Sequence, residues 1–287
     1  MRIAVAGSTS AVGRSAVPVL GGAGHELVHL PEDAAVMDVD RMAGALDGCD
    51  VLLNLAGQVP VGGVSGRRRA WRRHDLLRSE GARRLVQAAH DAGVRRVVHQ
   101  SHSLVYADQG AEWITEQSPL GVTPATEPVA VGEAAVQAFD GCARVGVVLR
   151  MGLVVGDSGL TRWSLRKCAR GRPIGMGNPD DYAHVIHSDD VGTAIEAALA
   201  VPSGTYNVGA DPVRRGDLVA AHAAAVGRPA SFLPAWRQRW CDGRVEPLGR
   251  SLRVSSEQFS AATGWSPRRP TFDASWLDAG VPEAARR

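Results

Sequence analysis

Short apolar runs alternate with longer amphipathic segments through the first half of the chain. Five runs have the length and composition of buried strands: residues 2–6, 25–30, 50–55, 96–99 and 145–150. Helical segments separate them, one ending near Leu20 and another spanning about 70–92. Strands joined by helices in this rhythm are typical of βαβ crossovers and a parallel sheet. The pattern therefore predicts an α/β fold with a doubly wound parallel sheet.

The pattern loosens after Gly152. Glycine and proline gather over residues 170–179, which predicts a loop. A strand is expected near 184–187, a helix over 190–200 and a strand at 205–208. We expect one unit spanning 1–287, in which residues 151–287 add late sheet strands and a small substrate lobe to residues 1–150.

Composition narrows the class of partner. The 287 residues are 45% hydrophobic with a net charge of +2, which argues against nucleic acid or a membrane as partner and leaves a small-molecule substrate. No apolar run approaches the roughly 18 residues of a membrane span, and the chain starts directly in a strand. We expect a soluble, cytoplasmic protein, with a homodimer as one possible assembly and the oligomeric state left open. The widely spaced cysteines are expected to be reduced thiols: Cys49, Cys142, Cys168 and Cys241.

A glycine loop follows the first predicted strand. It reads Ala6-Gly-Ser-Thr-Ser-Ala-Val-Gly13, at the turn where dinucleotide folds use glycine to let phosphate approach a helix N-terminus. This predicts a Rossmann nucleotide-binding part over residues 1–150. Ser10 stands at the middle glycine position. Its side chain either hydrogen-bonds phosphate or weakens and even abolishes cofactor binding.

The choice between NAD and NADP depends on charged residues near the second strand. Glu32, 19 residues beyond Gly13, suits the ribose 2′-hydroxyl of NAD. Arg14 could instead pair with the 2′-phosphate of NADP, and Glu32 could be a solvated loop acid. The balance favours NAD slightly.

Further motifs follow in order along the chain. They are Asp38-Val39, Asn54-Leu-Ala-Gly57, Leu149-Arg-Met-Gly-Leu-Val-Val-Gly156, Val185-Ile-His-Ser-Asp-Asp190, Tyr206-Asn-Val-Gly209 and Gly264-Trp-Ser-Pro267. Together they resemble the extended short-chain dehydrogenase/reductases, in the NAD-dependent epimerase/dehydratase group. The resemblance implies that the cofactor contacts Gly7, Thr9, Ser10, Ala11, Val12, Gly13, Glu32, Asp38, Val39, Leu55, Ala56 and Gly57.

The family's catalytic residues do not carry over. The resemblance implies a Tyr-x-x-x-Lys pair within Pro128-Val-Ala-Val-Gly-Glu133, where Val129 and Glu133 stand instead. The one lysine of the chain is Lys167, and the residue four before it is Trp163. In Gln100-Ser-His-Ser-Leu-Val-Tyr106, His102 takes the position of the catalytic serine or threonine.

Four residues are the candidates for replacement chemistry: His102, Tyr106, Ser101 and Glu133. Histidine can act as general acid or base near neutral pH, although His102 could also fill a vacated pocket and hydrogen-bond locally. Glu133 would share a helix face with Val129, as a pocket acid or as a solvated helix residue.

Two other groups carry a weaker signal. The run Arg67-Arg-Arg-Ala-Trp-Arg-Arg-His74 could hold an anion, but is more typical of an exposed helix start with Trp71 turned inward. His184 and His187 lack a third ligand at a recognisable spacing, so no metal site is expected.

Three functions remain open at this stage. The leading hypothesis is a small-molecule enzyme with altered chemistry, catalysing a dehydration, cyclisation or epimerisation in specialised metabolism. The second is a nicotinamide-dependent oxidoreductase with a substitute proton donor. The third is a noncatalytic dinucleotide-binding regulator.

Overall fold

The computed structural model describes residues 1–32, 38–57, 59–60, 67–141, 143–234 and 243–280. A six-stranded parallel sheet forms its centre, in the order β2-β1-β3-β4-β5-β9. The strands are β1 (Arg2–Ala6), β2 (Glu26–His29), β3 (Val51–Asn54), β4 (Arg96–His102), β5 (Val145–Met151) and β9 (Gly204–Val208). The strand order reverses direction at β1, so the carboxyl ends of β1 and β3 flank the crevice where such sheets bind ligands.

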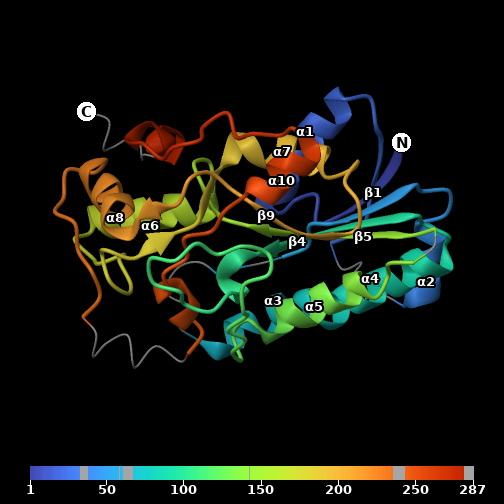
Figure 1. Ribbon diagram of the computed structural model, residues 1–287, viewed down its shortest axis with the longest axis horizontal. Helices are drawn as coiled ribbons and strands as arrows, with labels where there is room; N and C mark the ends of the chain where they lie inside the picture. Colours follow the sequence, from blue (N-terminus) through green and yellow to red (C-terminus); the bar gives the residue numbers. More distant parts are fainter. Residues whose placement is uncertain (33–37, 58, 61–66, 142, 235–242, 281–287) are drawn as a thin grey trace.

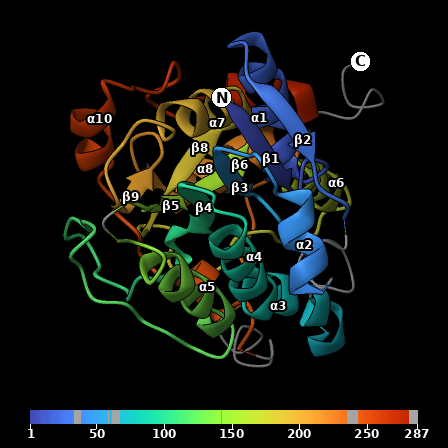
Figure 2. The same cartoon turned by 90° about the vertical axis from the view of Figure 1, so that its right-hand side faces the viewer.

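Helices cover both faces of this sheet (Figure 1). One face carries α1 (Ala11–Gly22), α7 (Ser188–Ala197) and α10 (Glu257–Thr263); the other carries α2 (Val39–Ala45), α3 (Arg72–Arg78), α4 (Glu80–Asp91) and α5 (Glu127–Gln137). Figure 2 shows the same three layers from the side. Each face has its own apolar core, with Leu20 and Ile195 in the first and Leu85 and Val136 in the second. The expected doubly wound α/β fold is confirmed.

A smaller lobe follows β5. It contains the parallel pair β6 (Leu153–Val155) and β8 (Val185–His187), and the antiparallel pair β7 (Tyr182–Ala183) and β10 (Val213–Arg214). Helices α6 (Gly159–Ala169) and α8 (Arg215–Ala224) pack beside them. Short 3₁₀ segments complete the described chain: η2 (Arg68–Trp71), η3 (Ser103–Val105), η4 (Glu246–Gly249) and η5 (Ala274–Gly280).

The prediction of one continuous helix before β4 is wrong. The single helix expected over about 70–92 is divided into η2, α3 and α4. At the break, Ser79 leaves the helical region (φ −105°, ψ −91°) and its hydroxyl donates to the Asp75 carbonyl at 2.7 Å. A serine side chain that bonds to a nearby backbone carbonyl competes with regular helix geometry in this way. The basic run is exposed at Arg67–Arg69, while Trp71 is half-buried against the edge of His74.

Candidate functional site

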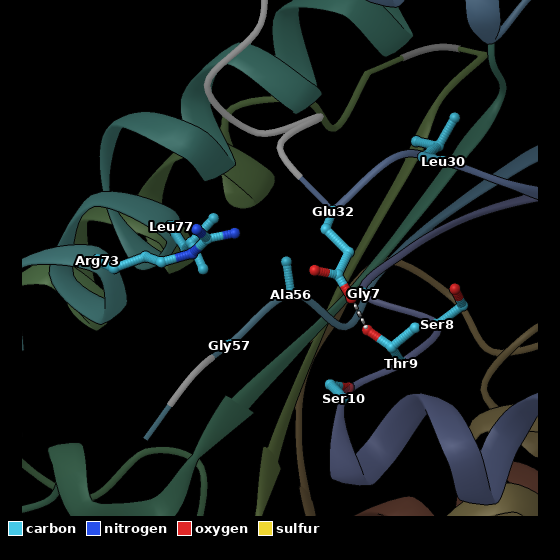
Figure 3. A pocket seen from close by; sticks show the side chains of 10 residues that line it. All are labelled: Gly7, Ser8, Thr9, Ser10, Leu30, Glu32, Ala56, Gly57, Arg73 and Leu77. Carbon is cyan, nitrogen blue, oxygen red and sulfur yellow. Dashed lines mark hydrogen bonds between the residues drawn. The ribbon is translucent and has the colours of Figure 1, made fainter. Parts of the chain in front are cut away.

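A cleft lies at the carboxyl ends of β1 and β3 (Figure 3). Its volume is about 270 Å³. One wall is the glycine loop, and the others come from the ends of β2 and β3 and from α3. The lining residues are Gly7, Ser8, Thr9, Ser10, Leu30, Glu32, Ala56, Gly57, Arg73 and Leu77.

Two glycines of the loop have no room for a side chain. A Cβ on Gly7 would lie 2.6 Å from the Ala56 backbone, and Gly7 has a φ of +80°. A Cβ on Gly13 would lie 2.2 Å from the Gly7 carbonyl oxygen. These contacts hold the loop tightly between β1, the β3 turn and α1. Both positions therefore require glycine for the packing of the loop, and their contact with a cofactor stays a prediction.

Ser10 caps α1. Its hydroxyl accepts the Gly13 amide hydrogen at 3.0 Å, in place of the free middle glycine of the family loop. A capping side chain of this kind satisfies one of the donors at a helix N-terminus. Ala11 and Val12 are the first two residues of the helix, so their amides remain in position to meet an anion.

Glu32 lies on the cleft wall. Its carboxylate accepts a hydrogen bond of 3.0 Å from the Thr9 hydroxyl, drawn as the dashed line in Figure 3. Arg14 is engaged elsewhere, since its guanidinium donates to the Thr9 carbonyl at 2.7 Å. The loop and the end of β2 are thus tied together at the place where the sequence predicts the ribose contact.

The other expected cofactor residues are more scattered. Asp38 is the N-cap of α2 and accepts from the Asp40 amide at 3.0 Å, with Val39 as the first residue of that helix. Neither residue lines the cleft. Leu55 is buried in the core under the β3 turn, whereas Ala56 and Gly57 line the cleft directly.

A buried ion pair lies near the carboxyl ends of β4 and β5, outside the residues that line the cleft. Glu133 on α5 is 2% exposed, so the interpretation as a solvated helix residue is wrong. Arg150 on β5 donates to both of its carboxylate oxygens, with the shortest distance 2.6 Å, and the Ser101 hydroxyl also donates to it. Burial alone would lower the pKa of Arg150, but its bonds to Glu133 outweigh this effect and raise the pKa. Glu133 and Val129 are buried on the same helix, as their spacing predicts.

Tyr106 belongs to the same network. Its side chain is fully buried, and its hydroxyl donates to the Asn207 amide oxygen at 2.8 Å. The Arg150 guanidinium lies 4.8 Å from the centre of the Tyr106 ring, while the backbone N–H of Asn207 donates to the Glu116 carboxylate. Burial raises the pKa of Tyr106. The phenol is therefore held in its protonated form by the fold.

A second buried cation, Arg78, lies between α3 and β4. Its guanidinium donates to the backbone and side-chain oxygens of Gln100, and it packs against Gly57. Burial lowers the pKa of Arg78 to about 10, although the negative charge of Glu133 opposes the shift. A guanidinium with this pKa still carries its charge near neutral pH.

Three imidazoles surround this cation. Burial, together with the charge of Arg78, lowers the pKa of His74 to about 2 and the pKa values of His99 and His102 to about 3. His102 is the last residue of β4 and is half-buried, and its Nδ1 has no hydrogen-bond partner among the described residues. These histidines are therefore neutral near pH 7.

Sequence reasoning missed both arginines of this region. Arg150 stands inside an otherwise apolar strand, and a charge there signals a buried partner. Arg78 follows His74 at helical spacing, which places both on the inward face of α3. Neither pattern identifies its partner, because Gln100, Glu133 and Arg150 come from separate elements.

The remaining polar candidates lie apart from the cleft. His184 is buried, which lowers its pKa to about 3, and His187 caps α7 by accepting from the Asp189 amide. Within the described ranges no three His, Cys, Asp or Glu residues are grouped to hold a metal. Cys49 and Cys168 are free thiols, whereas Cys142 and Cys241 fall outside the described residues. No helix in the described part of the chain is long and apolar enough to cross a bilayer.

The fold is similar to that of known proteins. Human epimerase family protein SDR39U1, solved with NADPH, has a TM-score of 0.80 at 23% identity over 98% of this chain and 99% of that one. MoeE5, solved with UDP-glucose and NAD, has a TM-score of 0.79 at 21% identity over 98% of this chain and 97% of that one. Identities at this level establish a shared fold.

Two sequence comparisons go further. A relative from Streptomyces sp. named 3-diazoavenalumate denitrifying reductase is 30% identical, covering 97% of this chain and 98% of the relative. The model of the NAD dependent epimerase/dehydratase family matches residues 3–209. The resemblance drawn from the motifs is confirmed: the chain belongs to the NAD-dependent epimerase/dehydratase family, a family of enzymes on the short-chain dehydrogenase/reductase scaffold.

Proposed function

We propose that this protein is a nicotinamide-dependent reductase whose substrate accepts a hydride without a proton from the protein. The observation that carries the proposal is that Ser101, Tyr106 and Glu133, near the ends of β4 and β5, are buried and already bonded to other protein groups. It corresponds to the oxidoreductase alternative of the sequence analysis, with one change: no substitute proton donor is required.

The residues of the cleft fit a dinucleotide. Gly7 and Gly13 form a loop into which no Cβ fits, and the amides that follow Ser10 suit a pyrophosphate. Glu32, held by Thr9, suits a ribose hydroxyl and favours NAD over NADP. Ala56 and Gly57 form the opposite wall. When bound, the reduced nicotinamide supplies the hydride.

The titratable side chains near the ends of β4 and β5 are poorly suited to exchange a proton with a substrate during its reduction. His102 has a pKa near 3, so at neutral pH it carries no proton to give as an imidazolium. Tyr106 is buried and donates a hydrogen bond to Asn207, and Glu133 forms an ion pair with Arg150. We assign Ser101, Tyr106 and Glu133 to positioning the ends of β4 and β5, and His102 to lining the substrate pocket as a neutral imidazole.

An aryldiazonium ion is a substrate class that matches such a pocket. It already carries a positive charge, so hydride addition to its terminal nitrogen needs no acid. A nitrogen–hydrogen bond forms, the carbon–nitrogen bond then breaks, dinitrogen leaves and the hydrogen ends on carbon. Each turnover consumes one hydride and no external proton. The name of the Streptomyces relative, a denitrifying reductase of a diazo compound, supports this substrate class. The proposed reaction would be a step of specialised metabolism.

The test combines the protein with reduced NAD or NADP and a carboxylated benzenediazonium salt. We expect cofactor oxidation and dinitrogen release in equal amounts, above the rate of the same mixture without protein. A His102→Gln variant should keep turnover within a few fold, because no proton comes from position 102.

Two outcomes would favour the other hypotheses. Loss of more than about a hundredfold in His102→Gln, about 2.7 kcal/mol of barrier, would assign His102 a chemical role and support the proton-transfer enzyme. Dinucleotide binding without turnover of any diazonium or sugar-nucleotide substrate would support the noncatalytic regulator.

A further inference from the structure

Arg73 is the cationic side chain that extends into the cofactor cleft from α3. In Figure 3 it reaches from the helix towards Ala56 and Glu32, on the wall facing the glycine loop. Arg73 is exposed, and Leu77, one turn further along α3, is buried and lines the same cleft. Its neighbour Arg72 is equally exposed but does not line the cleft.

The charged side chains nearest the glycine loop are already engaged. Arg14 donates to the Thr9 carbonyl, and Glu32 accepts from the Thr9 hydroxyl. Arg73 contrasts with both, since no carboxylate in the described part of the chain lies within ion-pair distance of its guanidinium. Arginine presents a planar fork of donors that matches a phosphate in two-point contact.

The glycine loop gives a reason for such a cation. Ser10 takes up the Gly13 amide, which leaves the loop with one fewer donor for a phosphate than an uncapped helix start. A dinucleotide brings at least two negative charges into a cleft whose other side chain of definite charge is the acid Glu32. Without a cation on the α3 wall, the electrostatic balance of the cleft would oppose the ligand.

We propose that Arg73 binds a phosphate group of the dinucleotide and so closes the cleft opposite the N-terminus of α1. The inference rests on the dinucleotide binding of the proposed function, and it adds a binding residue outside the glycine loop. The phosphate is either the pyrophosphate, common to NAD and NADP, or the 2′-phosphate of NADP.

The test measures dissociation constants of NADH and NADPH by calorimetry for the wild type, Arg73→Gln and Arg73→Lys. Arg72→Gln is the matched control, one residue earlier on the same exposed helix turn. We expect Arg73→Gln to weaken binding about tenfold, equivalent to about 1.4 kcal/mol. Arg73→Lys should recover part of the affinity. Raising the salt concentration should reduce the difference in affinity between the wild type and Arg73→Gln.

The two ligands separate the sources of the phosphate. An equal loss for NADH and NADPH assigns Arg73 to the pyrophosphate, and a loss confined to NADPH assigns it to the 2′-phosphate. Equal affinities of Arg73→Gln, Arg72→Gln and the wild type would overturn the proposal, as would a wild type that binds neither ligand. A normal Arg73 effect in a protein that reduces no diazonium would instead contradict the reductase function alone.

Discussion

The cleft at the glycine loop and the buried ion pair of Glu133 and Arg150 differ in whether their polar groups are available to a ligand. At the cofactor end, the glycine loop leaves backbone amides and exposed charges facing an open cleft. At the ends of β4 and β5, Glu133, Arg150, Ser101 and Tyr106 bond to or pack against one another inside the protein. One end therefore has groups available to a ligand, and the other has its charges already paired.

This difference shows why the fold accepts a buried glutamate at position 133. A lysine at position 133 would lie beside Arg150, and two buried cations would repel each other. Glutamate converts the same position into a stabilising partner for the strand arginine. The identity of residue 133 is thus coupled to the burial of Arg150, while the residues of the cleft have no such dependence.

Breaking the buried pair should have the largest effect. Glu133→Gln leaves Arg150 as an uncompensated buried charge and should lower the free energy of unfolding by about 3–5 kcal/mol. Pairing Glu133→Leu with Arg150→Met should recover much of this loss, because both charges are then absent. Denaturant unfolding measures both. A single variant as stable as the wild type would contradict the structural role given to Glu133.

The cofactor end should respond through ligand binding. A dinucleotide at 100 times its dissociation constant should stabilise the wild type by about 2.7 kcal/mol. Gly13→Ala should abolish this gain, since its Cβ would meet the Gly7 carbonyl oxygen at 2.2 Å. Gly21→Ala is the control on the same helix, with open space around its Cβ. Thermal shift with and without ligand compares them, and an unchanged shift in Gly13→Ala would place the ligand elsewhere.

The buried histidines predict a dependence of stability on pH. His99, His102 and His184 have pKa values near 3 in the folded protein, below the ordinary value of 6.5. Below pH 6.5 the unfolded chain binds protons that the folded protein refuses, so stability is lost as pH falls towards 3. Below pH 6.5, each of these histidines should lower the free energy of unfolding by about 1.4 kcal/mol for every unit that the pH falls. Unfolding free energies at about pH 7 and about pH 5.5 check the slope, and equal values would contradict neutral burial.

The smallest effect concerns cofactor choice. Glu32→Gln should weaken NADH binding and improve NADPH binding, each by about threefold, because the repulsion of a 2′-phosphate is removed at an exposed site. Competition binding of the two ligands gives the ratio. Thr9→Val, which removes the hydroxyl that holds Glu32, should change the ratio in the same direction. An unaltered ratio in both variants would exclude Glu32 from the choice.

The fold and the cofactor loop were predictable because their determinants are local. Apolar runs and turn glycines mark strands and the loop directly, and Arg2–Ala6 matches its predicted strand residue for residue. Near the ends of β4 and β5, the sequence identified Ser101, His102 and Glu133 as candidates but did not predict their contacts. Whether Glu133 meets solvent or Arg150 depends on the approach of α5 to β5, which neither segment encodes alone. The break at Ser79 and the entry of Arg73 into the cleft likewise depend on packing between distant elements.

The proposed function requires that hydride transfer proceed without a proton from the protein. The direct test is the single-turnover rate of cofactor oxidation, with an aryldiazonium substrate, from about pH 6 to about pH 8. A rate that stays level across this range is the predicted result, in the wild type and in His102→Gln alike. A rate that falls about tenfold per pH unit above the pKa of a single group would show a protein acid at work and contradict the account.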